Sequence, residues 1–125
     1  MTTKILIVDD SATVRREVLA ALAGSGFRVV EAVDGHDGLR QVDAHDDIAL
    51  VLCDVNMPNM NGVEMVEQLK ERGSTHRPPV VMLTTEGQPS LILRAKKAGV
   101  RGWIVKPFQP ALLVESVRRL TAQPA

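Results

Sequence analysis

The sequence predicts an α/β fold built on a parallel β-sheet, and three observations lead to this prediction. Five short apolar runs rich in β-branched residues recur along the chain, at 5–8, 29–33, 48–53, 80–83 and 103–105. Each run is continuous and does not alternate strictly with polar residues, which is typical of strands covered on both faces. Segments with helical spacing separate the runs. Because right-handed crossovers place helices on both faces of such a sheet, we expect five strand–helix repeats.

The helices are predicted in order from apolar spacing and stop signals. Val14, Val18 and Leu22 form the stripe of the first helix, and Gly24 and Gly26 follow it directly. The remaining helices are predicted around 39–42, 63–69, 91–98 and 112–120, with Gly35, Gly73, Gly99 and Pro110 as boundary residues. No residues are left over for a second domain, so we expect 1–125 to form a single domain.

Charge and composition exclude several classes of function. Fifteen basic and fifteen acidic residues cancel, so no global field favours nucleic acid or a membrane surface as a partner. The N-terminus has too few apolar residues for a signal peptide or a membrane span, which makes a cytoplasmic location the expectation. The single cysteine, Cys53, lies within an apolar run, and we expect it to be structural.

Chemically versatile side chains stand where the predicted strands end. In open parallel sheets, ligands bind beyond the carboxyl ends of the strands. These ends carry Asp9, Asp10, Asp54, Thr84 and Lys106. Singly, each has a structural explanation, since Asp10 or Ser11 would suit a helix cap and Asp54 the start of a turn. Three acids, a hydroxyl and an ammonium on one rim together favour a functional site.

Three carboxylates in one pocket predict a divalent cation. At about 5 Å apart they would repel by roughly 3 kcal/mol per pair at an effective dielectric near 20, which one lysine does not offset. Donors that are all oxygen favour a hard ion, and Mg²⁺ fits better than Ca²⁺ or Zn²⁺. The histidines at His36, His45 and His76 lack ligand spacing and are assigned no role.

Mg²⁺, a free carboxylate, a hydroxyl and a lysine suit phosphoryl transfer to a carboxylate. The sequence has no glycine-rich phosphate-cradling loop of the nucleotide-binding type, so ATP is not expected as the direct donor. The residues alone do not select the nucleophile among Asp9, Asp10 and Asp54.

Four segments resemble the response-regulator receiver domain, in order and over essentially the whole chain: "ILIVDDSATVRR", "LCDVNMPNMNG", "VVMLTTEGQ" and "GWIVKPF". The resemblance implies a flavodoxin-like (βα)5 three-layer sandwich with sheet order 2-1-3-4-5. It also implies a signalling switch that is not an enzyme, in which Asp54 accepts a phosphoryl group from a phosphohistidine of a sensor histidine kinase.

The same resemblance implies a role for each residue on the rim. Asp10, Asp54 and the backbone carbonyl of Asn56 would ligate Mg²⁺, and Asp9 would act through water. Thr84 and Lys106 would bind the phosphoryl oxygens. Receivers commonly have a cis peptide after this lysine, and X-Pro bonds tolerate cis at a cost of about 0.5 to 1 kcal/mol, so we expect Lys106–Pro107 to be cis.

Within the family, the sequence is most similar to the stand-alone chemotaxis type, which has no effector domain. Asn56 and Glu86 occupy positions that in the family tune the lifetime of the phosphoryl group. Trp103 stands where the family has a switch aromatic, often tyrosine. A strand aromatic packed under the fourth helix is the alternative interpretation of Trp103.

The resemblance places the output surface on the fourth helix, fifth strand and fifth helix of a monomer. Its partner would be the flagellar motor switch protein or another target, and a phosphatase is a further candidate partner. Four basic residues in this region suit an acidic partner, or else form an ordinary solvated helix face: Arg94, Lys96, Lys97 and Arg101.

Three other functions stay open. A phosphorelay intermediate or phosphate sink would use the same pocket. A receiver portion of a DNA-binding regulator fits less well with neutral charge, and a metal-dependent phosphatase would turn over substrate instead of stopping at one phosphate per chain.

Overall fold

Strands and helices alternate along the whole of the described chain. The structure is a computed structural model that describes residues 3–71, 77–85 and 89–121. The strands are β1 (Lys4–Val8), β2 (Arg28–Ala32), β3 (Ile48–Asp54), β4 (Val80–Thr84) and β5 (Gly102–Val105). The helices are α1 (Ala12–Ala23), α2 (Gly35–Ala44), α3 (Gly62–Glu71), α4 (Pro89–Lys97) and α5 (Pro110–Thr121). The predicted order of elements is therefore confirmed.

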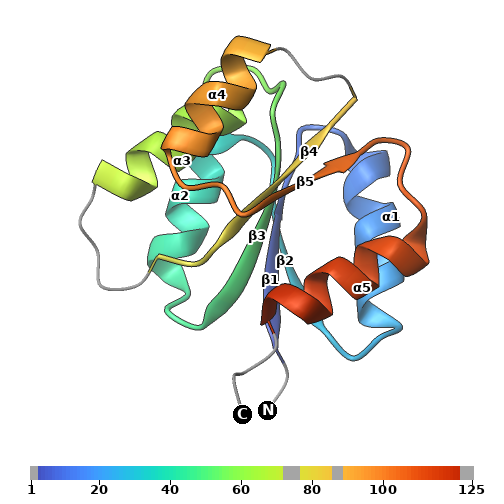
Figure 1. Ribbon diagram of the computed structural model, residues 1–125. Coiled ribbons are helices and arrows are strands. Elements are labelled where there is room, and N and C mark those ends of the chain that lie inside the picture. Colours follow the sequence, from blue (N-terminus) through green and yellow to red (C-terminus); the bar gives the residue numbers. More distant parts are fainter. Residues whose placement is uncertain (1–2, 72–76, 86–88, 122–125) are drawn as a thin grey trace.

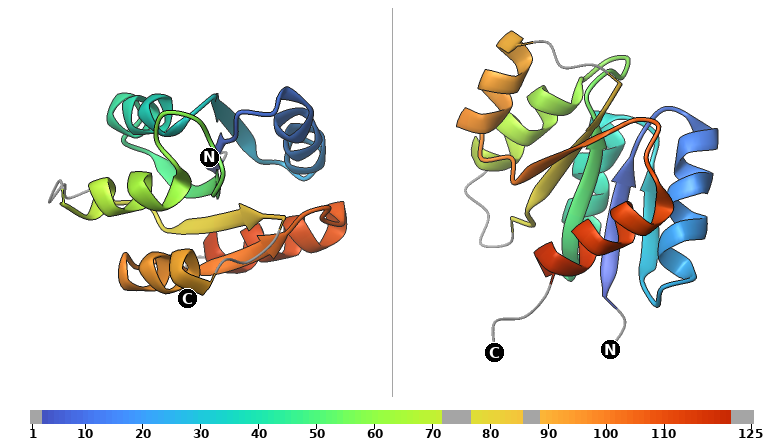
Figure 2. Two further views of the ribbon diagram at one scale, coloured as in Figure 1. Left: turned by 90° about the horizontal axis from the view of Figure 1, so that it is seen from above. Right: turned by 45° about the vertical axis from the view of Figure 1, so that its right-hand side comes forward.

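The sheet is parallel throughout, and its strand order is β2-β1-β3-β4-β5. Helices α1 and α5 cover one face, and α2, α3 and α4 cover the other (Figures 1 and 2). The fold is the predicted flavodoxin-like three-layer sandwich. Strand order reverses between β1 and β3, the place where ligands bind in such sheets.

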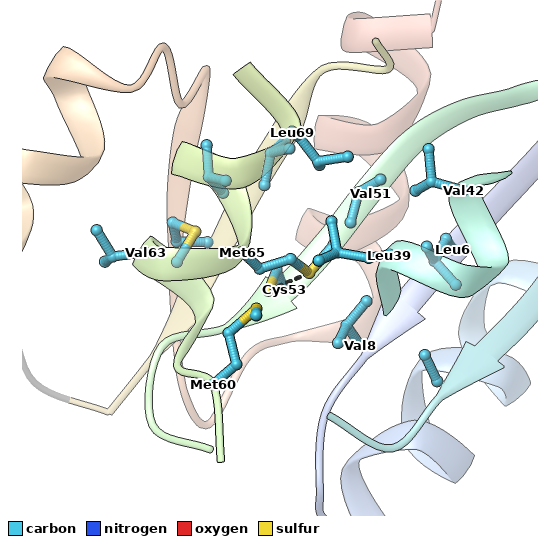
Figure 3. Close-up of a cluster of buried hydrophobic side chains, with 14 of the residues drawn as sticks. Leu6, Val8, Leu39, Val42, Val51, Cys53, Met60, Val63, Met65 and Leu69 are labelled. Atoms are coloured by element: carbon cyan, nitrogen blue, oxygen red, sulfur yellow. Dashed lines mark hydrogen bonds between the residues drawn. The ribbon is translucent and has the colours of Figure 1, made fainter. Parts of the chain in front are cut away.

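Each face of the sheet has its own apolar core, because successive strand residues point to opposite faces. Ile5 and Ile7 of β1 pack toward α1 and α5. Leu6 and Val8 pack instead toward the core that includes residues of α2 and α3 (Figure 3). These side chains are fully buried, which explains why the β1 run is apolar without alternation.

Cys53 belongs to the core on the α2 and α3 side. Its Sγ lies 3.8 Å from the Met65 Sδ to which it donates (Figure 3). Burial raises the pKa of the Cys53 thiol, and the neighbouring Asp54 charge raises it further. Since thiol reactivity depends on the thiolate, this environment fits the expected structural role.

Two residues predicted as helix boundaries, Gly35 and Pro110, are the first residues of helices. Helix α2 begins at Gly35, earlier than predicted, because the Asp34 side chain caps it by accepting from the Asp37 backbone N–H at 2.8 Å. Pro110 is the first residue of α5, a position where the missing N–H of proline has no cost. Strand β2 stops before Val33, whose side chain is 50% exposed.

Strand register determines which residues meet at the rim. Val8 is paired with Cys53, so the next residues, Asp9 and Asp54, leave adjacent strands at the same level. At the other side of the rim, the Lys106 backbone N–H donates to the Thr84 carbonyl at 2.8 Å. The ends of β1, β3, β4 and β5 thus contribute to one edge.

Three residues considered in the sequence, Gly73, His76 and Glu86, lie outside the described residues. Among the residues that are described, no helix has the length and apolarity needed to cross a membrane.

Candidate functional site

Every polar atom of the Asp9 backbone and carboxylate has a hydrogen-bond partner in the protein. Its backbone N–H donates to the Ala32 carbonyl at 3.1 Å. One carboxylate oxygen accepts from the Ser11 backbone N–H at 2.9 Å, and the other accepts from Lys106 Nζ at 2.9 Å. The side chain is fully buried. Both oxygens of this acid therefore already have protein donors.

Asp10 is the exposed acid of the rim. Within the described part of the chain its side chain makes no hydrogen bond or ion pair, so its oxygens face solvent with their lone pairs available. The helix-capping role that the sequence left open between Asp10 and Ser11 falls to Ser11, whose Oγ accepts from the Val14 N–H at 3.2 Å.

Asp54 is the last residue of β3 and is only 6% exposed. The backbone N–H of Asn56 donates to its carboxylate. Beyond it, the chain turns back at once, since the Gly62 backbone N–H donates to the Val55 carbonyl at 3.0 Å. The turn ends in a reciprocal cap between Asn61 and Glu64, with distances of 2.8 and 3.1 Å.

Lys106 joins the two buried acids. Its Nζ lies 2.9 Å from Asp9 Oδ2 and 3.2 Å from Asp54 Oδ1. Burial alone would lower the pKa of Lys106, but the hydrogen bond and charge of Asp9, together with Asp54, outweigh it and raise the pKa. The ammonium therefore stays charged and partly offsets the repulsion between the carboxylates.

Burial, followed by repulsion from Asp9, raises the pKa of Asp54, while Lys106 and the Asn56 N–H act in the opposite direction. A folded-state pKa above the unfolded value means that folding favours the protonated acid. The stability contribution of this carboxyl therefore decreases as pH rises through the unfolded and then the folded pKa.

Replacing Lys106 by methionine is expected to destabilise the fold in a pH-dependent way. At pH 7.5 without Mg²⁺, two buried carboxylates would lose their cation, and we expect a loss of about 2 kcal/mol. At acidic pH, Asp54 takes up a proton more readily than a solvated carboxyl because its pKa is raised, and the loss should shrink. Urea unfolding at both pH values measures this difference. An equal loss at both values would contradict the electrostatic explanation.

Thr84 and Trp103 lie on the two neighbouring strands β4 and β5. Thr84 is 5% exposed and ends β4 at the rim. Trp103 is partly buried and packs against the core that contains Ala95 of α4. The interpretation of Trp103 as a packed strand aromatic therefore describes this conformation. The predicted lifetime residue Glu86 falls in the part of the chain that is not described.

The acidic cluster fits a hard divalent cation. Asp9, Asp10 and Asp54 each offer one carboxylate oxygen, and these oxygens lie within 4.8 Å of one another. The set contains no sulfur or imidazole, and Asp10 is exposed to solvent. Such donors suit Mg²⁺ with retained water molecules better than Zn²⁺.

One residue near the site was missed in the sequence. The Arg15 guanidinium donates through Nη1 to the Asp9 carbonyl at 2.7 Å. Its hydrogen-bond partner is a backbone atom, and no residue pattern signals such a contact.

The α4, β5 and α5 surface is less basic than the sequence indicates. Arg94 does not project as a free charge, because its Nη2 and Nε bind the Glu67 carboxylate of α3 at 2.7 and 3.3 Å. Lys96, Lys97 and Arg101 are exposed. Each element also carries a large exposed apolar side chain: Leu93 on α4 at 55%, Val105 on β5 at 62% and Leu112 on α5 at 56%.

Comparison with known proteins agrees with this geometry. A family model described as the response regulator receiver domain matches residues 5–118. The chain is 39% identical over 115 residues to the chemotaxis protein CheY1 of Helicobacter pylori, covering 91% of this chain and 93% of that protein. It is 38% identical over 115 residues to the CheY homolog of Campylobacter jejuni, covering 91% and 88%.

Solved structures show the same architecture. The chemotaxis protein CheY4 of Vibrio cholerae superimposes with a TM-score of 0.88 at 35% identity, covering 96% of this chain and 99% of that one. A putative response regulator from Chloroflexus aurantiacus also has a TM-score of 0.88, at 30% identity, covering 98% and 100%.

Proposed function

Because the chain belongs to the response regulator receiver domain family, we propose that it is a phosphorylation-controlled switch of a two-component system with Asp54 as the acceptor. The observation that carries this proposal is the contact of one lysine with two buried acids beside a third, exposed acid. The donor would be a phosphohistidine on a sensor histidine kinase.

In the proposed reaction, an Asp54 carboxylate oxygen forms a bond to phosphorus while the phosphorus–nitrogen bond of the phosphohistidine breaks. The leaving imidazole takes up a proton. Mg²⁺, when bound, would supply charge neutralisation for the transferring group. Lys106 would exchange its contact with Asp54 for one to a phosphoryl oxygen, and the Thr84 hydroxyl would donate to another.

The hydrogen-bond pattern supports different roles for Asp9 and Asp10, the two acids that follow β1. Asp9 has both carboxylate oxygens occupied by Ser11 and Lys106, so it would reach the cation through water. Asp10 has no such partner within the described residues and would bind directly, with Asp54 and the Asn56 carbonyl.

Removal of Mg²⁺ by EDTA should reduce labelling of the protein by acetyl phosphate by about a hundredfold or more, because several kcal/mol of charge stabilisation would be lost. Trp103, the single tryptophan, allows binding to be followed by fluorescence. We expect Mg²⁺ to quench or shift its emission. A flat titration would argue against coupling between the ring and the pocket, and labelling that persists in EDTA would argue against the cation.

The output of the switch is proposed to arise at the α4, β5 and α5 surface. A phosphoryl group on Asp54 would favour a conformation in which Thr84 moves toward it and Trp103 turns into the vacated space. The exposed Leu93, Val105 and Leu112 with nearby lysines suit a partner peptide that is both apolar and acidic.

By similarity to the chemotaxis relatives, we propose that this partner is the flagellar motor switch protein and that the phosphodonor is a chemotaxis kinase. The active form of the chain would be a cytoplasmic monomer. We also propose that residues 1–125 act as a single receiver domain. A phosphatase as an additional partner belongs to the same proposal.

A comparison of captured proteins tests the output surface. Beryllofluoride-treated protein should retain the target from a cell extract more strongly than untreated protein, and Leu112→Ser should abolish the difference. Leu19→Ser provides a matched control, since Leu19 is exposed on α1 and away from the proposed surface. If the captured protein is instead a histidine-containing phosphotransfer protein, the relay function is favoured over motor control.

A further inference from the structure

Arg15 connects the acidic rim to the neighbouring strand and helix. It lies in the first half of α1, and its side chain is 16% exposed. Its Nη1 donates to the Asp9 carbonyl at 2.7 Å, and its Nε donates to Glu31 Oε1 at 3.2 Å. Glu31 is in β2, paired in register with Ile7 of β1. The Arg15 guanidinium thus connects α1 to β2 and to the segment between β1 and α1.

The carbonyl that accepts from Arg15 belongs to the peptide bond between Asp9 and Asp10. The N–H of Asp9 is already fixed by the Ala32 carbonyl at 3.1 Å, so Arg15 completes the restraint of the backbone on both sides of Asp9. The Asp10 side chain has no hydrogen bond or ion pair of its own in the described residues. The orientation of the Asp9–Asp10 peptide therefore determines where the Asp10 carboxylate lies.

We propose that Arg15 is a positioning residue that directs the Asp10 carboxylate toward Asp54 and thereby sets the affinity of the acidic cluster for a divalent cation. This inference rests on the proposed function of the cluster as a Mg²⁺ site. Arg15 itself touches neither the cation nor the phosphoryl group.

A positioning role and a simple charge effect predict opposite results. As a nearby positive charge, Arg15 would weaken cation binding, so its neutralisation would tighten Mg²⁺ binding. As a positioning residue, its loss would weaken binding. Arg15→Lys separates the two further, because it keeps the charge but lacks the planar fork that reaches Glu31 and the Asp9 carbonyl together.

Isothermal titration of the 125-residue chain with Mg²⁺ alone tests this role. We expect the dissociation constant to rise about tenfold in Arg15→Gln and to rise also in Arg15→Lys, as is usual when a partner that orients metal ligands is lost. Arg16→Gln and Arg16→Lys are the matched controls, because Arg16 is exposed on the same helix without a partner in the described residues. Thermal unfolding in EDTA checks that each variant is folded.

Labelling by acetyl phosphate provides a second measurement. The Mg²⁺ concentration for half-maximal labelling should rise in Arg15→Lys, while the rate at saturating Mg²⁺ should match the wild type. A dissociation constant in Arg15→Lys equal to that of Arg16→Lys overturns the positioning role. A wild-type chain that binds no Mg²⁺ overturns the cation site itself, which is a separate failure.

Discussion

Asp54→Asn is expected to reduce phosphate incorporation from acetyl phosphate to background. The carboxamide has nearly the same shape as the carboxylate, so its oxygen is able to keep the contact with Lys106 that Asp54 makes at 3.2 Å. It lacks the negative charge that makes the carboxylate a nucleophile, and no acyl phosphate forms. Radiolabel bound per chain, or intact mass after labelling, measures the effect.

The same variant should be folded at least as stably as the wild type at pH 7 without Mg²⁺. Burial and the charge of Asp9 raise the pKa of Asp54, so the fold disfavours its ionised form, and asparagine removes that charge. Urea unfolding therefore separates loss of chemistry from loss of structure. A large drop in the free energy of unfolding would contradict the electrostatic description of the rim.

Asp46→Asn is the matched control for this experiment. Asp46 is exposed in the turn before β3, at the opposite end of that strand from Asp54. The substitution makes the same chemical change and should leave labelling unchanged. Labelling of Asp54→Asn at the wild-type rate would transfer the acceptor role to Asp9 or Asp10.

Gly62→Ala is expected to cause the largest loss of stability among small substitutions near the site. A Cβ at Gly62 would overlap the backbone oxygen of Asp54 and lie 2.8 Å from Met82 Cε. The methionine is able to move, but the Asp54 carbonyl belongs to a buried strand end and is not. We expect the free energy of unfolding to fall by about 2 to 3 kcal/mol, the usual range for overpacking.

Because the displaced atom belongs to Asp54, labelling by acetyl phosphate should fall together with stability. Gly24→Ala is the control: its φ is −66°, and the nearest atom to an added Cβ is the Ala20 carbonyl oxygen at 3.4 Å. The free energy of unfolding of Gly24→Ala should be unchanged or higher by about 0.4 to 1 kcal/mol. Unchanged stability and labelling in Gly62→Ala would show that the turn after β3 adapts easily.

The order of strands and helices was predictable because its signals are local. Apolar runs without alternation predicted strands with two covered faces, and Ile5 to Val8 are indeed fully buried between two cores. The boundaries of α2 and α5 were less predictable, because Gly35 and Pro110 are compatible both with ending and with beginning a helix. The cis Lys106–Pro107 bond, expected from the family resemblance, is confirmed.

The candidate site was predictable as a set of residue types at strand ends, while the assignment of roles among its acids was not. Asp9 and Asp10 are adjacent in the chain and identical in type. Only the fold distinguishes them, since Asp9 is buried with both oxygens occupied and Asp10 is exposed. The choice of Asp54 as acceptor still rests on the family and on the labelling experiment.

Periodicity and composition are properties of short segments. The sequence alone therefore determined the strands and helices, the two-sided core and the acids at the strand ends. The pairing of Val8 with Cys53 brings Asp9 beside Asp54, and Lys106 reaches Asp9 from 97 positions away. Arg94 is neutralised by Glu67 of another helix, and Arg15 holds a backbone carbonyl. These contacts depend on strand register and helix packing, which join distant segments and leave no signal in any local stretch of residues.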